Sequence, residues 1–147
     1  MPRNAVTYDE DFFAWTEEQA RLLRAGEFSR LDIENLGEEI EDMGRSIRRE
    51  LRNRLALLTM HLLKWRYQPG HQSPSWSATI REQRDQIAEL LEESPSLKRL
   101  PAQDLKKIYR LALIKALCDT GLAEASFPAE CPFTPDQIMA QDFLPEG

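Results

Sequence analysis

Apolar residues recur at helical spacing along one long stretch of the chain, residues 31–68. They advance in steps of three or four residues, with one extra step of four between Ile47 and Leu55, which is typical of a continuous helix. The members of this stripe are Ile33, Leu36, Ile40, Met43, Ile47, Leu51, Leu55, Leu58, Leu62 and Trp65. We therefore predict a long helix over about 32–67, roughly 50 Å in length at about 1.5 Å per residue. Since a compact domain of this size does not need so long a helix, we expect the helix to have a second partner.

The two halves of this helix differ in how much of their surface is apolar. In residues 55–65 apolar side chains occur on nearly every side, so this half is expected to be the buried centre of a bundle. In residues 33–47 the apolar stripe is narrow, and Gly37 and Gly44 lie beside it. Each glycine costs about 0.5–1 kcal/mol relative to alanine in a helix interior. Close approach of another helix would offset that cost.

Capping signals place helices on both sides of the long one. For a shorter N-terminal helix, Asp9 is the expected N-cap and Gly26 marks the end. Thr79 and Glu82 have capping-box spacing, which predicts the start of a third helix, and Ser94-Pro95 ends it.

The C-terminal part of the chain carries two further helix signals. A fourth helix is expected over about 101–120, with Gly121 just past its end. The sequence Thr134-Pro135-Asp136-Gln137 combines a cap, a proline and a glutamine at the positions that begin a short last helix. We therefore predict an all-α fold and one domain over residues 1–147. It is an irregular helical bundle with one long central helix (about 32–67), a shorter N-terminal helix, a C-terminal helical hairpin and a short last helix.

Composition excludes several classes of protein. Of 147 residues, 41% are hydrophobic and 30% are charged, as in folded soluble domains. No window approaches the roughly 18–20 apolar residues that span a bilayer, and residues 1–11 lack the apolar run of a signal peptide, so we expect a cytoplasmic protein without a membrane partner. The net charge of −6 disfavours non-specific binding to nucleic acid. Cys118 and Cys131 lack CxxC spacing and are expected to be free thiols.

Sequence motifs for catalysis are missing, and we predict no cofactor and no metal. A di-metal bundle needs Glu-x-x-His on two helices, and the chain has no such tetrad. It also has no Gly-x-Ser-x-Gly and no phosphate-binding glycine loop. His61 lies in the most apolar part of the long helix, where a hydrogen-bonded structural role is the default and a general base or ligand is the alternative. A zinc site from His61, His71, Cys118 and Cys131 matches no compact zinc module.

The charge of the long helix changes sign near its middle. Residues 34–42 contain five acidic residues and no basic one, whereas residues 45–54 contain five arginines and one glutamate. An antiparallel homodimer with its two-fold axis close to Gly44 would place each acidic block against the other copy's arginines. The rival explanation is a weak pair of Glu41 with Arg45 inside one helix. The predicted dimer surface consists of Glu38, Ile40, Glu41, Met43, Gly44, Ile47, Arg48, Arg49 and Arg52.

Several motifs, in this order along the chain, resemble a bacterial family known as domain of unknown function 29. They are Tyr8-x-x-Asp11-Phe12-x-x-Trp15, Leu31-Asp32-x-x-Asn35-Leu36-x-Glu38-Glu39-Ile40-Glu41, Leu58-x-x-His61-Leu62-Leu63-Lys64-Trp65-x-Tyr67-Gln68-Pro69, Ser75-Trp76-x-x-x-Ile80-x-x-Gln83-Arg84, Ser94-Pro95-Ser96-Leu97, Thr120-Gly121-Leu122 and Cys131-Pro132-Phe133-Thr134. The resemblance covers residues 8–145 and implies an all-helical domain with no established activity. Asp119 departs from the family pattern, which favours glutamate before Thr-Gly-Leu. Motif positions implied by the resemblance are Glu38, Glu41, His61, Lys64, Trp65, Gln68, Trp76 and Arg84.

Three functional interpretations follow. The first is a non-enzymatic helical module that binds protein, itself included, with an acidic or helical protein as the alternative partner. The second is an enzyme or ligand-binding protein with a polar site of His61, Lys64, Gln68, Trp76 and Arg84, for which a structural polar network is the competing explanation. The third and weakest is a nucleic-acid-binding regulatory module that uses the arginine face of residues 45–54.

Overall fold

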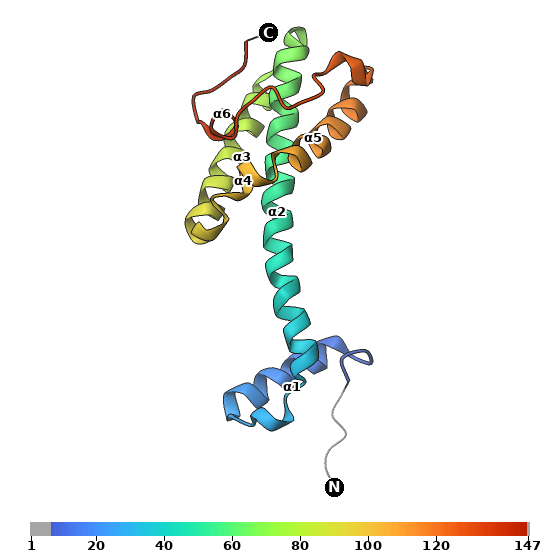
Figure 1. Ribbon diagram of the computed structural model, residues 1–147, viewed down its shortest axis with the longest axis vertical. Helices are drawn as coiled ribbons and strands as arrows, with labels where there is room; N and C mark the ends of the chain where they lie inside the picture. The colour runs from blue at the N-terminus through green and yellow to red at the C-terminus, as the bar shows by residue number, and fades with distance from the viewer. Residues whose placement is uncertain (1–6, 147) are drawn as a thin grey trace. The chain divides into compact units, whose positions relative to one another are not determined.

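In a computed structural model, the described residues 7–146 form helices and connecting loops with no strand among them, which confirms the all-α prediction. The α-helices are α1 (Phe12–Ala25), α2 (Ile33–Tyr67), α3 (Pro74–Glu93), α4 (Leu100–Gln103), α5 (Leu105–Thr120) and α6 (Pro135–Met139) (Figure 1). Short 3-10 turns lie at Phe28–Arg30, Pro69–His71, Pro95–Leu97 and Glu124–Ser126. The helix predicted over 32–67 is confirmed as one unbroken element, α2.

By its internal contacts the chain divides into two compact units, with the boundary between Ser46 and Ile47 inside α2. The prediction of one domain stays a prediction. The expected absence of a signal peptide concerns residues 1–11, of which 1–6 lie outside the described residues. None of the helices in residues 7–146 has the length and apolarity required to cross a bilayer.

The first unit is built by α1 packing on the start of α2. Trp15 and Leu22 are its buried apolar residues, and the Trp15 indole Nε1–H donates to Asp32 Oδ2 at 3.0 Å. The Gln19 side-chain oxygen accepts from the Asp32 backbone N–H at 2.8 Å, and Tyr8 donates to Glu39. These contacts fix one side of the first turns of α2 and leave its other side exposed.

The predicted N-cap of α1 is wrong by two residues. Asp11 takes this position, with extended backbone and its carboxylate accepting from the Ala14 N–H at 3.1 Å. Asp9 lies inside the preceding turn, where the Glu10 and Asp11 N–H groups both bond to the Thr7 carbonyl. The predicted end is confirmed, because Gly26 adopts the left-handed conformation with φ 73°.

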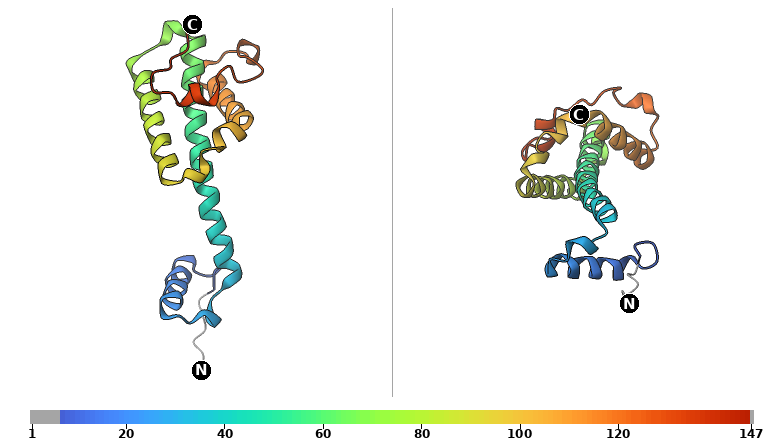
Figure 2. Two further views of the ribbon diagram at one scale, coloured as in Figure 1. Left: turned by 60° about the vertical axis from the view of Figure 1, so that its left-hand side comes forward. Right: turned by 60° about the horizontal axis from the view of Figure 1, so that its bottom comes forward.

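The second unit surrounds residues 47–67 of α2, with α3 and α5 on two sides of it (Figures 1 and 2). The prediction that residues 55–65 form the buried centre is confirmed: Leu55, Leu58, Leu62 and Leu63 are fully buried. After α5 the chain crosses back over α2 to α6, which packs on α3 (Figure 1). Phe127, Phe133 and Ile138 of this C-terminal segment complete the core.

The predicted start of the third helix is wrong. This helix starts at Pro74, not near Thr79, because Ser73 caps it by accepting from the Trp76 N–H at 3.4 Å. The Thr79 hydroxyl instead donates to the Ser75 carbonyl at 3.0 Å, within the helix. A proline at the first helical position is pre-organised for a helix start, and it outweighs the weaker downstream signal.

The predicted fourth helix is divided into α4 and α5. Asp104 leaves helical geometry between them, with φ −104° and ψ 16°, and its carboxylate pairs with Arg52 of α2 at 3.5 Å. Aspartate favours such non-helical backbone because its side chain competes for local hydrogen bonds. The predicted ends are confirmed at Gly121, which has φ 69°, and at the Thr134–Gln137 capping box.

Candidate functional site

The first half of α2 exposes an unusually apolar face. Ile33 is 70% exposed, Ile40 65%, Met43 65% and Ile47 41%, and all four follow the narrow stripe of the helix. A side-chain carbon placed on Gly37 or Gly44 would have no neighbour within 4 Å, so the backbone beside the stripe is also uncovered. We call Ile33, Gly37, Ile40, Met43, Gly44 and Ile47 the open face of α2.

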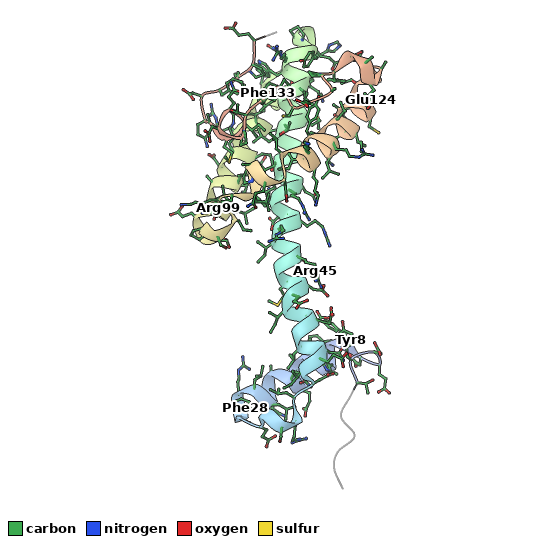
Figure 3. All side chains as sticks on the ribbon, viewed as in Figure 1. Tyr8, Phe28, Arg45, Arg99, Glu124 and Phe133 are labelled. Carbon is green, nitrogen blue, oxygen red and sulfur yellow. The ribbon has the colours of Figure 1, made fainter. Side chains whose placement is uncertain are left out.

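Charged residues flank the open face. Arg45 pairs within the helix with Glu38 at 3.6 Å, with Glu41 at 3.5 Å and with Asp42 (Figure 3). Its hydrogen bond to Asp42, followed by the charges of the neighbouring carboxylates, raises the pKa of the Arg45 guanidinium. The intrahelical pair of Glu41 with Arg45 is therefore present in this structure.

The other four arginines of residues 45–54 fall into two groups. Arg52 pairs with Asp104, and Arg54 pairs with Glu50 at 3.2 Å and donates to Gln83 at 3.3 Å. Arg48 and Arg49 are exposed, and neither forms an ion pair with any other residue in the described part of the chain. Of the arginines in residues 45–54, these two are the ones without an ion pair among the described residues.

The predicted polar site is only partly assembled. The Lys64 ammonium lies 2.9 Å from the Asp119 carboxylate and 4.5 Å from the centre of the Trp76 ring, so α2, α3 and α5 each contribute one member. Lys64 is 9% exposed, and its charge is compensated by the carboxylate and the aromatic face. The sequence did not single out Asp119 as a site residue, because a pairing across 55 positions leaves no local signal.

His61 lies one turn before Lys64 on α2. Its Nδ1–H donates to the Leu57 carbonyl at 3.0 Å. Burial lowers the pKa of the imidazole below its ordinary value of 6.5; the charge of Lys64 adds to this effect, while the Leu57 carbonyl and Asp119 oppose it. His61 is thus held in its neutral form by its surroundings. Its role, structural or catalytic, stays a prediction.

Arg84 lies apart from this cluster, and Gln68 follows Lys64 by about one helical turn. Arg84 is 3% exposed and donates to the carbonyls of Ile138 at 2.9 Å, Gln137 at 3.3 Å and Gln141 at 3.5 Å. It therefore binds the C-terminal end of α6, where exposed carbonyls favour a cation. Gln68 is half-buried, and its backbone N–H continues the last turn of α2 to the Lys64 carbonyl.

Within residues 7–146, no group of three or more His, Cys, Asp or Glu side chains lies together as a metal site would require. Cys118 is exposed and Cys131 is half-buried, both as free thiols. Burial raises the pKa of the Cys131 thiol, which makes it a weaker nucleophile than an ordinary cysteine at neutral pH. Lys64 and Arg84 contact other residues of the fold, whereas the apolar side chains of the open face are 41–70% exposed.

Comparison with known proteins gives one match. The family model described as "Domain of unknown function DUF29" matches residues 7–144. Neither the curated proteins nor the solved structures contain a match to the chain.

Proposed function

We propose a function from the geometry alone, since the chain belongs to the family of the domain of unknown function DUF29 and that description names no activity. The protein is a non-enzymatic helical module that binds protein and associates with itself. Its partner is a second copy, and the contact is the open face of α2 in an antiparallel pair.

The observation that carries this proposal is the exposure of Ile33, Ile40, Met43 and Ile47 on one face of a single helix. Isolated apolar residues on a surface are ordinary, but a continuous apolar stripe along several helical turns marks an interaction site. Burying large aliphatic side chains contributes about 1.5–3 kcal/mol each relative to leaving them exposed. A second helix laid on this face would gain that contribution from both copies.

The charges favour a second copy in antiparallel orientation. With a two-fold axis close to Gly44, the acidic block of residues 34–42 lies against the partner's Arg48 and Arg49. Both of these arginines lack an intramolecular ion pair among the described residues. A parallel pair would place like charges side by side, which is unfavourable. A two-fold arrangement is also the commonest symmetry of soluble oligomers.

The intrahelical pairs of Arg45 do not remove this complementarity. Residues 34–42 contain five carboxylates, so the single positive charge of Arg45 leaves the block negative. Gly44 lies at the proposed axis, and a side-chain carbon added there would meet nothing within 4 Å, which lets the two backbones approach closely. The helical cost of the glycine is then offset by contact between the copies.

Static light scattering tests the proposal. At micromolar concentration and low salt we expect the mass of a dimer, and we expect the dimer to weaken at high salt because its charge contacts are screened. Met43→Asp adds a charge to the open face and should give a monomer. Ala78→Asp adds the same charge at an exposed position on α3 and should leave the dimer intact. A monomer for the parent protein under both salt conditions contradicts the proposal.

A further inference from the structure

A second candidate surface lies in the unit formed by residues 47–147, along one side of α5. It is an open groove of about 680 Å³. One wall is α5, and the other is the segment after it, residues 124–131, on which Figure 3 labels Glu124. The groove shares no residue with the open face of α2.

The floor of the groove is an apolar column on α5. Leu105, Tyr109, Leu113 and Leu117 follow one another at steps of four residues and line it together. The column extends about 18 Å at about 1.5 Å per residue. The Tyr109 hydroxyl donates to the Pro128 carbonyl, which ties the two walls together at a fixed separation. Tyr109 is buried and the three leucines are half-buried, so the floor presents only part of their apolar surface, together with Ile114, which is 55% exposed.

The two rims of the groove carry opposite charges. Lys106 and Arg110 stand one helical turn apart on the α5 rim, whereas Glu124 and Glu130 stand on the other rim. All four side chains are exposed, and in the part of the chain that the structure describes none of them belongs to an ion pair. The groove thus separates two charged rims that do not neutralise each other.

We infer that this groove binds an amphipathic helix of another protein. The apolar face of that helix lies on the Leu105–Leu117 column, its acidic flank faces Lys106 and Arg110, and its basic flank faces Glu124 and Glu130. Carboxylates at positions i and i+4 of the bound helix match the one-turn spacing of Lys106 and Arg110.

The shape of the groove favours a helix over a small molecule or a second copy. The floor of the groove follows about three turns of one helix, which fits a second helix, whereas small ligands are mostly enclosed by their sites. Self-association through α2 involves neither wall of the groove. The inference therefore stands or falls independently of the proposed dimer.

A pair of synthetic helical peptides tests the inference. Both carry the same leucine stripe and the same numbers of Glu and Lys; one has the acidic flank on the side that would face Lys106 and the other has the flanks exchanged. Cys131 lines the groove, so binding can be followed as protection of its thiol from a disulfide reagent in a Cys118→Ser protein. We expect the matched peptide to bind at least about tenfold more tightly than the exchanged one, because the exchanged peptide places like charges together.

Variants of α5 make the test specific. Lys106→Glu with Arg110→Glu should reverse the preference between the two peptides. Lys107→Glu with Lys115→Glu changes the net charge equally at exposed α5 positions outside the groove and should leave the preference unchanged. Circular dichroism checks that each variant is folded. Equal affinity for the two peptides, no protection of Cys131 by either, or an equal response of both double variants overturns the inference.

Discussion

Arg84 is a polar residue of α3 whose hydrogen bonds lie within the fold. Its guanidinium is buried and binds the carbonyls of Gln137, Ile138 and Gln141 at the end of α6. A planar group with five N–H donors suits several carbonyls at once, which a lysine could not match. The contact fixes the C-terminal segment, whose Phe133 and Ile138 are part of the core.

Removing this group should destabilise the protein. We expect Arg84→Met to lower the free energy of unfolding by about 2–3 kcal/mol, because buried carbonyls lose charged donors. Arg81→Met, an exposed substitution on the same helix, should change it by less than about 0.5 kcal/mol. Urea denaturation measures both. Equal effects of the two substitutions would mean that Arg84 does not hold the C-terminal segment.

His61 makes stability depend on pH. Because burial lowers its pKa in the folded state, the unfolded chain binds the proton more readily near the ordinary pKa of 6.5. The contribution of neutral His61 to the free energy of unfolding is therefore fully present above pH 6.5. Stability falls as the pH is lowered through and below 6.5. A histidine NMR titration should give a midpoint below 6.5 for His61. In His61→Gln, the free energy of unfolding should fall less at acidic pH than it does in the parent protein. An NMR midpoint above 6.5 for His61 contradicts this prediction.

Among the elements, α2 combines a buried half with an exposed one. The sequence predicts this division, because residues 55–65 are apolar on nearly all sides whereas residues 33–47 carry a narrow stripe.

Helix ends were predictable where one strong signal acts, as at Gly26, Gly121 and the Thr134–Gln137 capping box. The prediction was wrong where two signals compete, as at Ser73 against Thr79. Asp104, at the break between α4 and α5, pairs with Arg52, and helical periodicity does not contain such a tertiary contact.

Substitution of Gly44 by alanine should have opposite effects on an isolated α2 and on a paired one. In the structure nothing lies within 4 Å of an added side-chain carbon, so Gly44→Ala should stabilise an isolated helix; the gain is about 0.5–1 kcal/mol. In the proposed dimer the added methyl groups lie between the two backbones and should weaken association. Sedimentation equilibrium of Gly44→Ala should therefore show a larger dissociation constant than the parent, while Ser46→Ala, an exposed neighbour, should not. Tighter association of Gly44→Ala would place the interface elsewhere.

For the molecule as a whole, the all-α class and the family follow from sequence patterns, whereas the arrangement of polar groups does not. Lys64 and Asp119 lie 55 positions apart, and their pairing depends on how α5 is placed on α2. Of the predicted polar site, the fold joins Lys64 to Trp76 and directs Arg84 to α6. The groove on α5 was not predicted either, because its second wall is an irregular segment without periodic pattern.

The proposed dimer is defined by the antiparallel pairing of α2, and distances between spin labels measure that pairing directly. Labels would be attached to Ser46→Cys or to Glu34→Cys, each exposed on α2, in a protein with Cys118→Ser and Cys131→Ser. With the axis close to Gly44, the two labels at position 46 are near neighbours, whereas the two at position 34 are separated by about 30 Å along the helices at about 1.5 Å per residue. A short distance at position 46 and a long one at position 34 are the predicted result. Equal short distances at both positions would show a parallel pair, and no intermolecular distance at either would show that α2 does not pair; each contradicts the account.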